Sequence, residues 1–463
     1  MKKDSFGTAG IQAQKIGFGE KVGYGLGDFA SNLVWGAVGS FMVFFYTDIA
    51  GIAAAAIGTV MLISRIFDGF SDILMGIVMD KTKSRHGKAR PWLLWMAIPY
   101  GVSAVLLFTV PPFGETGKII YAFVTYNLAT TVIYTAINIP YGAMTALITQ
   151  DQYQRTVINI FRMVFAMVGA LFVNMATVPL VGAMGGGATG WQRAFMVYGA
   201  VGAVIFMMCF FSTRERVKPA QAEKAVVPVK EGIKALKYNK PWMIMLALGL
   251  CVFIGQGLGG ANIYYAQYIL GDAGKMSLLM MAQFLPLIVG LFAMAPVIKR
   301  HGKRNTALAG SVIGIGGSLV QIAAPTSFVP VLVGMAIKGF AMAPLAGTVF
   351  AMIADTIEYG EWKSGVRTEG LVYSAASFGG KVGSGVGVGM VGWILAWGGY
   401  VAGAPTQSAN ALFAIKAMFL YIPVAISAIT ILLLLAYKLD KQYPMIVEEL
   451  HRRNNGGAEG RQA

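Results

Sequence analysis

The chain has few charged residues and few cysteines. Charged side chains make up only 13% of its 463 residues, whereas a soluble domain usually carries about a quarter. With 56% hydrophobic residues, the composition excludes a soluble fold, which has no room to bury so many apolar runs. The two cysteines, Cys209 and Cys251, both lie in apolar segments. They indicate neither a disulfide framework nor a metal site, and inert packing is the expected role.

The first twenty residues also lack the apolar stretch of a cleavable signal peptide. They are polar and basic, with Lys2, Lys3 and Lys15 among them. We therefore expect the first membrane-spanning helix to act as its own insertion signal.

The sequence contains many long runs without a charged residue, for example 92–114, 119–150 and 305–337. A helix needs about 20 mostly apolar residues to cross a bilayer. We therefore predict an all-α polytopic membrane protein with twelve transmembrane helices. The predicted spans are 24–46, 51–79, 91–111, 118–144, 156–184, 192–212, 241–270, 277–298, 305–323, 328–355, 371–398 and 410–437.

Basic residues outside the predicted spans gather on one side of the membrane. That side has both ends of the chain and clusters at 81–90 and 299–304, whereas the other side has only Lys118, Arg193 and Lys275. The positive-inside rule places the basic side in the cytoplasm, so both termini should be cytoplasmic. The net charge of +16 then reflects orientation in a bacterial inner membrane and contact with anionic lipid, and no nucleic-acid partner is expected.

One long basic segment of low hydrophobicity divides the chain near its middle. We expect an N-terminal six-helix half over 1–212, a central cytoplasmic loop at 213–240, a C-terminal six-helix half over 241–437 and a cytoplasmic tail over 438–463. Within the tail, 454–457 is expected to be disordered.

A short sequence motif that occurs once in each half favours an internal duplication. Arg85-His86-Gly87-Lys88 follows the second predicted span, and Arg300-His301-Gly302-Lys303 follows the eighth. Recurrence at the same topological place suits a transporter built from two six-helix halves. Two unrelated basic turns remain the alternative.

The second predicted span carries three charged residues, Arg65, Asp68 and Asp72. A charge at the centre of a membrane helix costs at least about 2.5–3.5 kcal/mol, so it needs a partner or a water-filled cavity. The spacing places all three on one narrow face, and two carboxylates one turn apart repel unless a cation or proton lies between them. This pattern favours a coupling-ion site. Na⁺ needs several hard oxygens, whereas H⁺ needs one carboxylate whose surroundings favour the protonated form.

These carboxylates have two other interpretations. An Arg–Asp cluster that only joins helices stays open. A carboxylate pair for glycoside cleavage is not expected, because nothing else in the sequence builds a hydrolase, and no enzyme activity is predicted.

The fourth predicted span contains Tyr134, Thr135, Asn138 and Tyr141 near its cytoplasmic end, with Pro140 expected to bend the helix there. Amide, hydroxyl and phenol groups suit polyol recognition, and an aromatic face suits the apolar side of a sugar ring. Hydrogen bonding between helices is an equally open interpretation.

Asp28 in the first span, Arg162 in the fifth and Lys381 in the eleventh are further deep charges. An inward Arg or Lys could hold a substrate carboxylate, and Asp28 could accept sugar hydroxyls, although each could instead form an ion pair between helices. Lys338 and Lys416 are weaker candidates, because they could reach the interface or pair internally.

The glycine-rich segment around Lys381 looks like a phosphate-binding loop at first sight. It lacks the required glycine spacing, and Val382 stands where Ser or Thr must bind Mg²⁺. Close helix packing is the better interpretation, so we expect no nucleotide hydrolysis and no cofactor beyond a coupling cation.

An acidic stretch lies between the tenth and eleventh predicted spans, close to Lys363. It could form salt bridges to the basic loops and lock a cytoplasmic gate, or it could be a solvated loop. The expected gating and salt-bridge residues are Arg65, Asp355, Glu358, Glu361 and Arg367.

Several of these segments, taken together, are highly specific. They are Tyr24-Gly25-Leu26-Gly27-Asp28-Phe29, Phe45-Tyr46-Thr47-Asp48, Arg65-Ile66-Phe67-Asp68 with Asp72, Arg85-His86-Gly87-Lys88-Ala89-Arg90-Pro91-Trp92, Asn138-Ile139-Pro140-Tyr141-Gly142 and Asp355-Thr356-Ile357-Glu358-Tyr359-Gly360-Glu361-Trp362. Over essentially its whole length the chain resembles the glycoside–pentoside–hexuronide:cation symporters of the major facilitator superfamily. The segments at 138–142 and 365–370 look most like the glucuronide carrier.

The resemblance implies roles for particular residues. Asp68, Asp72 and Thr135 would form the site for H⁺ or Na⁺. Asp28 and Arg162 would contact the sugar, and Lys381 would lie close to both sites.

Two positions depart from the melibiose permease of that family. Asn138 stands where the permease has an acid, which argues against melibiose-like galactosides and suits an anionic substrate such as a glucuronide facing Arg162 and Lys381. Ser71 replaces an Asn of the permease and leaves the choice of H⁺ or Na⁺ open.

The sequence therefore predicts a cation:glycoside symporter that imports a glucuronide or pentoside by alternating access and functions as a monomer. A lysolipid or other amphiphile carrier of the same fold is the alternative. A membrane sensor that does not transport is a third hypothesis, for which the sequence supplies no output domain.

Overall fold

The computed structural model describes residues 16–149, 151–217, 236–365 and 369–459. Within these ranges every regular element is a helix. The first group consists of α1 (Phe18–Phe44) continued by η1 (Phe45–Ile49), α2 (Ala54–Lys81), α3 (Arg90–Leu107), α4 (Glu115–Asn127) continued by η2 (Leu128–Tyr134) and α5 (Thr135–Ile148), α6 (Gln152–Ala183) and α7 (Gly187–Ser212).

The second group follows the central segment of the chain. It consists of α9 (Lys240–Gly257) continued by η3 (Leu258–Gly260), α10 (Ala261–Tyr264) and η4 (Tyr265–Ile269), α11 (Lys275–His301), α12 (Lys303–Ala323), α13 (Phe328–Ser364), α14 (Glu369–Trp397), and α15 (Ala409–Lys416) continued by η5 (Ala417–Tyr421) and α16 (Ile422–Ala436), then α17 (Leu439–Glu459).

Ten helical segments of the described chain are long and apolar enough to cross a membrane. Helices α2 and α14 are not among them, but they have 28 and 29 residues, or about 42 Å at 1.5 Å per residue. That exceeds the roughly 30 Å of the hydrocarbon core. The prediction of an all-α polytopic membrane protein is confirmed, and the arrangement is consistent with twelve spans.

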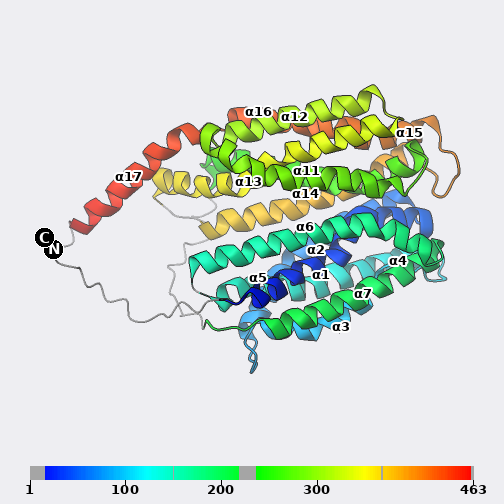
Figure 1. Cartoon of the computed structure of the whole chain (residues 1–463), viewed down its shortest axis with the longest axis horizontal. Helices are drawn as coiled ribbons and strands as arrows, with labels where there is room; N and C mark the ends of the chain where they lie inside the picture. The colour runs from blue at the N-terminus through cyan, green and yellow to red at the C-terminus, as the bar shows by residue number, and fades with distance from the viewer. Residues whose placement is uncertain (1–15, 150, 218–235, 366–368, 460–463) are drawn as a thin grey trace.

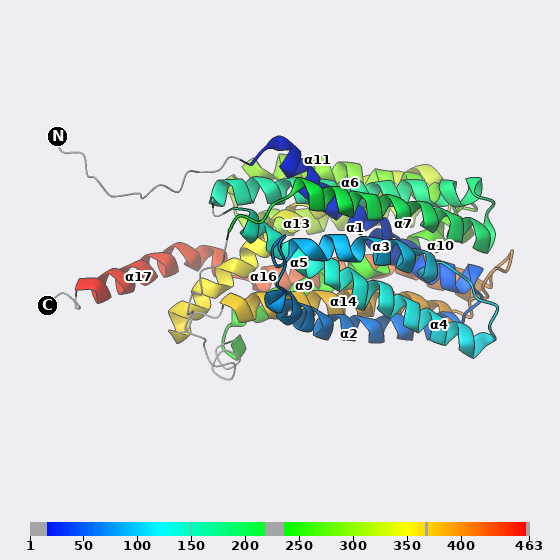
Figure 2. The same cartoon turned by 90° about the horizontal axis from the view of Figure 1, so that it is seen from below.

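The two groups of helices form two layers that pack along their length (Figure 1). Helices α2 and α14 run side by side at the junction, as do α6 and α11 (Figures 1 and 2). Glycines permit the close approach of α2 and α14, because a Cβ on Gly58 would lie 2.7 Å from the carbonyl oxygen of Gly389. A Cβ on Gly380 would lie 2.9 Å from the Phe253 ring of α9. Close packing is therefore the role of the α14 glycines.

The repeated motif at Gly87 forms a specific turn between α2 and α3. Gly87 has a φ of 103°, a conformation that favours glycine. The carboxylate of Glu215, just after α7, accepts hydrogen bonds from the backbone N–H groups of Lys88, Ala89 and Arg90 at 3.0, 2.8 and 2.6 Å. It thereby caps the start of α3.

The repeated motif at Gly302 forms the same arrangement in the second group of helices. Gly302 has a φ of 81°, and Asp440, just after α16, accepts a hydrogen bond of 2.9 Å from the backbone N–H of Arg304. The Arg304 side chain donates to the carbonyl oxygen of Leu434 at 2.6 Å, as Arg90 donates to that of Phe210 at 2.8 Å. Equivalent caps at equivalent turns support the predicted duplication.

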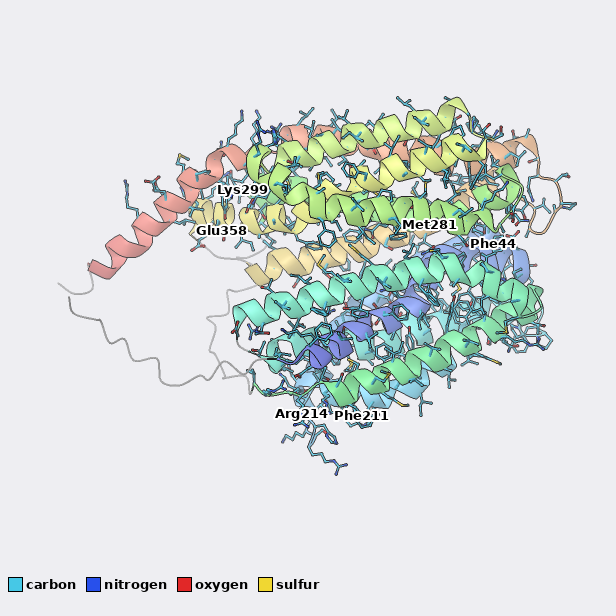
Figure 3. All side chains as sticks on the ribbon, in the orientation of Figure 1. Phe44, Phe211, Arg214, Met281, Lys299 and Glu358 are labelled. Atoms are coloured by element: carbon cyan, nitrogen blue, oxygen red, sulfur yellow. The ribbon has the colours of Figure 1, made fainter. Side chains whose placement is uncertain are left out.

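Basic residues mark one end of the bundle. Figure 3 shows Lys299 and Arg214 toward the end from which α17 extends, and Phe44 and Met281 toward the other. We call these the basic end and the opposite end.

Two expectations for the basic end are wrong. The stretch after Asp355 is not a loop, because α13 continues to Ser364 and ends at Gly365, whose φ is 70°. The tail is also helical through 454–457, since α17 runs to Glu459. The charges on α13 mark where the helix passes beyond the apolar layer and do not mark its end.

Candidate functional site

The charged face of α2 contacts the fourth span in the middle of the bundle. Arg65 and Asp68 are buried, with 3.4 Å between Nη1 and Oδ2. Asp68 also accepts a hydrogen bond from the hydroxyl of Thr131 in η2. Thr131 was not predicted from the sequence, although it lies one turn before Thr135 on the same helix face.

Asp72 connects the two groups of helices. Its carboxylate forms an ion pair with Lys381 of α14, and the Thr135 hydroxyl donates to it at 3.4 Å. The Lys381 ammonium also donates to the backbone carbonyl of Asp68 at 3.1 Å. The Ser71 hydroxyl lies 3.3 Å from that of Thr135. The structure therefore brings the predicted cation-site residues together with Lys381.

This cluster, which we call the α2 cluster, supplies several oxygen donors. The donors are the carboxylates of Asp68 and Asp72 and the hydroxyls of Ser71, Thr131 and Thr135. Hard oxygen ligands of this kind suit Na⁺, and a half-buried carboxylate such as Asp72 suits H⁺. In this conformation the Lys381 ammonium lies beside Asp72 and pairs with its carboxylate.

Asp28 and Arg162 form a second cluster between α1 and α6. Arg162 Nε lies 2.7 Å from Asp28 Oδ2, and the Tyr141 hydroxyl donates to the same carboxylate at 3.1 Å. The guanidinium stacks 4.5 Å from the centre of the Tyr141 ring. The interpretation of Asp28 and Arg162 as an ion pair between helices therefore holds for this conformation.

Tyr141 is fully buried. Its hydroxyl also contacts the backbone carbonyl of Tyr24, and the Tyr24 hydroxyl donates back to the Tyr141 carbonyl, both at 2.5 Å. Tyr141 is predicted to bind the sugar; in this conformation it is buried and its hydroxyl donates to Asp28.

Trp35 of α1 contacts the α2 cluster, although no sequence pattern singled it out. Its indole ring lies 4.2 Å from the Arg65 guanidinium and stacks on Tyr134 at 4.5 Å. Trp35 follows Asp28 by seven residues, which places both on one face of α1. Asn138 lies one turn beyond Tyr134 and is partly exposed.

A cavity of about 480 Å³ lies beside Trp35, Arg65 and Lys381. Its other walls come from α9, α13 and α14. Gln256, Ser377 and Ser384 add polar groups. The cavity therefore adjoins the α2 cluster on one side and the second group of helices on the other.

The opposite end is closed by hydrogen bonds between the two groups. Asp48 of η1 accepts hydrogen bonds from the hydroxyls of Tyr268 and Tyr400 at 2.6 and 2.5 Å, and from the Gly403 N–H at 3.4 Å. The hydroxyls of Thr47 and Tyr264 meet at 2.6 Å. We call this set the Asp48 gate. No local sequence pattern indicates these contacts of Asp48, because Tyr268, Tyr400 and Gly403 lie more than 200 residues away in the chain.

The residues expected at a gate of the basic end are arranged differently. Asp355 pairs with Lys303, which belongs to the same group of helices, so this ion pair does not cross between the groups. Arg65 pairs within the α2 cluster. Glu358 and Glu361 lie on the helical extension of α13, and Arg367 lies outside the described residues. Lys338 contacts the Gln321 amide oxygen at 3.4 Å and the Phe419 ring, as expected for internal pairing.

Comparison with known proteins assigns the family. Residues 23–441 match the family described as "MFS/sugar transport protein", and the chain belongs to it. It is therefore a membrane transporter and not an enzyme.

Relatives of similar length include three that are informative. The isoprimeverose transporter of Lactiplantibacillus pentosus is 37% identical over 96% of this chain and 93% of its own length. The inner membrane symporter YicJ of Escherichia coli is 33% identical over 89% and 90%. The glucuronide carrier protein homolog of Escherichia coli is 32% identical over 95% and 97%.

Solved structures agree on the fold. A bacterial homolog of the lysosomal transporter Spinster, in an inward-facing conformation, aligns with a TM-score of 0.65 at 13% identity, over 92% of this chain and 97% of its own. The nucleoside transporter NupG (D323A mutant) aligns with a TM-score of 0.64 at 14% identity, over 90% and 98%.

Proposed function

We propose that the protein is a symporter that couples H⁺ or Na⁺ to the import of a glycoside by alternating access. The contact between Asp72 and Lys381 is the observation that carries the proposal, because it ties a carboxylate of one helix group to an ammonium of the other. A cation that binds Asp72 replaces the Lys381 ammonium. The ion pair between α2 and α14 is then lost, and the contact between these two helices weakens. Binding therefore biases the equilibrium between the two access states.

The sugar binds next to this contact, between the helix groups. Asp28 accepts hydroxyl groups, Tyr134 and Asn138 contribute a ring and an amide, and Arg162 exchanges its carboxylate partner for the substrate. Tyr141 positions Asp28, as its buried hydrogen bonds indicate. The names of the isoprimeverose transporter and the glucuronide carrier homolog support a sugar or sugar acid as cargo.

Charge balance favours a glucuronide over a neutral pentoside. Three carboxylates and three basic side chains meet around the site: Asp28, Asp68, Asp72, Arg65, Arg162 and Lys381. Because these charges cancel, a bound cation leaves an excess of one positive charge, and uncompensated buried charge is costly. A substrate carboxylate removes that excess, whereas a neutral sugar does not.

The positive-inside rule places the basic end in the cytoplasm. The N-terminal half, residues 1–212, then provides the cation site and most sugar contacts, and the segments at 213–240 and 438–463 are cytoplasmic. With the Asp48 gate closed toward the exterior, the conformation is inward-facing. No step of this cycle requires a second copy of the chain, so we propose that the monomer transports.

The test is uptake into proteoliposomes. Wild-type protein should concentrate a radiolabelled glycoside under an inward Na⁺ or H⁺ gradient, and Asp72→Cys should lose concentrative uptake entirely. Asp272→Asn, which removes an exposed loop carboxylate, is the control and should behave as wild type. If Asp72→Cys still concentrates sugar against its gradient, the cation-site assignment is wrong.

A further inference from the structure

The charged side chains that line the cavity are all basic. Arg65 of α2 and Lys381 of α14 line it, and none of the described residues around it is an aspartate or a glutamate. The carboxylates of Asp68 and Asp72 contact these two side chains but do not line the cavity themselves. A recess whose charged groups all have one sign concentrates ions of the opposite sign. The cavity therefore favours an anionic group over a neutral one.

Arg65 has hydrogen-bond donors that the structure leaves unused. Its side chain is only 4% exposed, and Nη1 lies 3.4 Å from Asp68 Oδ2, longer than the roughly 2.7–2.9 Å of a good charge-assisted hydrogen bond. Its Nε has no hydrogen-bond partner among the described residues. A buried donor without an acceptor is destabilising. An acceptor placed in the cavity would therefore stabilise the Arg65 guanidinium.

The other two basic side chains of the site already have acceptors. Arg162 donates to both carboxylate oxygens of Asp28, from Nε at 2.7 Å and from Nη2 at 3.4 Å. Lys381 forms an ion pair with a carboxylate and also donates to the backbone carbonyl of Asp68 at 3.1 Å. Arg65 is therefore the least compensated of the three cations.

Packing from α1 and α14 holds Arg65 at the edge of the cavity. The Trp35 indole lies 4.2 Å from its guanidinium, and a Cβ on Gly385 would lie 2.7 Å from the Arg65 Cβ. Trp35 also lines the cavity and stacks on Tyr134, which belongs to the proposed sugar contacts. The cavity and the sugar contacts therefore adjoin at this aromatic pair, and Arg65 lies next to it.

We propose that Arg65 binds the acidic group of the substrate and thereby sets the preference for a sugar acid over a neutral sugar. This inference rests on the proposed function and names the residue responsible for its charge preference. A carboxylate accepts two parallel hydrogen bonds from Nε and one Nη of a guanidinium, which makes the contact strong and directional. The hydroxyl group of a neutral sugar cannot form this pair of hydrogen bonds and brings no charge.

Arg65 also connects the substrate to the cation site. Asp68 is a predicted cation ligand, and its carboxylate accepts from Arg65 in this conformation. A cation bound at Asp68 competes with Arg65 for that carboxylate, so Arg65 becomes free to donate to the substrate. Cation and sugar acid should therefore bind cooperatively, each raising the affinity for the other by the same factor.

The test measures uptake into proteoliposomes of sugars that differ in charge. Radiolabelled methyl glucuronide and methyl glucoside form one pair, and methyl galacturonide and methyl galactoside form another. In each pair the acid has a carboxylate where the neutral sugar has a hydroxymethyl group, and methyl xyloside has neither. In at least one pair, we expect wild-type protein to half-saturate with the acid at a concentration at least about tenfold lower than with the neutral sugar, or about 1.4 kcal/mol.

The same wild-type protein tests the link to the cation. Raising Na⁺ or H⁺ should lower the half-saturating concentration of the acid at least about threefold more than that of its neutral partner. Equal cation effects on the two sugars would contradict the inference, and this result needs no variant to fold.

Variants assign the preference to Arg65. Arg65→Lys keeps the positive charge but cannot form the bidentate contact, so it should reduce the acid's advantage to less than about threefold. Gly385→Ala places a methyl group against the Arg65 side chain and should act in the same direction. Arg162→Lys changes a proposed sugar contact, so it should weaken both members of a pair and leave their ratio unchanged. Arg300→Lys changes an exposed arginine that does not line the cavity and should behave as wild type.

Each ratio compares two sugars on one protein, so a variant that folds poorly lowers both uptakes and does not imitate the expected result. If Arg65→Lys and Gly385→Ala both lose all uptake, the cation dependence of the wild type decides. Equal half-saturation by acid and neutral sugar in the wild type, or an advantage of the acid that survives both variants, refutes the Arg65 site while the proposed symport stands. An advantage lost only in Arg162→Lys refutes it as well.

Two further outcomes separate the inference from the proposed function. Uptake of methyl xyloside or another neutral glycoside without uptake of either acid refutes the Arg65 site alone. No uptake of any glycoside under either gradient refutes the proposed function together with the inference.

Discussion

The Asp48 gate permits a quantitative prediction for Asp48→Asn. The carboxylate accepts hydrogen bonds from Tyr268 and Tyr400. Hydrogen bonds to charged groups contribute about 1.5–3 kcal/mol each, and neutral ones about 0.5–1.5 kcal/mol. Loss of the charge therefore weakens closure by about 2–3 kcal/mol over the two tyrosines. At 1.4 kcal/mol per factor of ten, the equilibrium should shift roughly 30- to 150-fold toward the outward-open state.

The assay is cysteine labelling from outside right-side-out vesicles. Leu250→Cys places a thiol in the cavity, in a background where Cys209 and Cys251 are replaced by alanine. A membrane-impermeant maleimide should label this thiol faster when Asp48→Asn is added. Tyr421→Phe, which removes a hydroxyl that lies outside the gate, should leave the rate unchanged. Equal labelling rates with and without Asp48→Asn would refute the closure of this end by Asp48.

Three further predictions concern the site and the fold. Arg162→Ala leaves Asp28 in the bundle without its cation, so the detergent-solubilised protein should lose up to about 3–5 kcal/mol of stability. Adding Asp28→Asn should restore the melting temperature but not sugar binding; a full return of binding would contradict the assigned roles. Glu215→Ala removes the cap of α3 and should cost about 0.5–2 kcal/mol, measured as a lower melting temperature; an unchanged value would show that the cap is dispensable. Gly392→Val should prevent folding or transport, since a Cβ there would clash with the Ala54 carbonyl oxygen; normal expression and uptake would contradict the close packing of α2 and α14.

The sequence predicted the helices well, because each span is encoded locally by a run of apolar residues. It also identified the charged face of α2, since Arg65, Asp68 and Asp72 share one helix face. The end of α13 was misplaced, because charge density alone cannot distinguish a loop from a helix that continues beyond the membrane.

Contacts between distant segments could not be predicted in the same way. The family resemblance implied that Lys381 lies close to the cation site, but its pairing with Asp72 depends on how the two helix groups pack in one conformation. The contacts of Asp48 with Tyr268 and Tyr400 depend on that packing as well. Trp35 was overlooked because an aromatic residue in an apolar helix has no local signal that separates stacking from lipid contact. The apolar side chains that line the cavity likewise come from both α9 and α13. The sequence of either helix alone does not show that these side chains meet.

The central claim is that cation and glycoside fluxes are coupled through this protein. Sugar uptake by wild-type proteoliposomes, measured with and without an imposed Na⁺ or H⁺ gradient, tests it most directly. The account predicts accumulation above the external concentration only while one of these gradients is present, and collapse to equilibrium when an ionophore dissipates it. Uptake that stops at equilibrium under every gradient would contradict the claim.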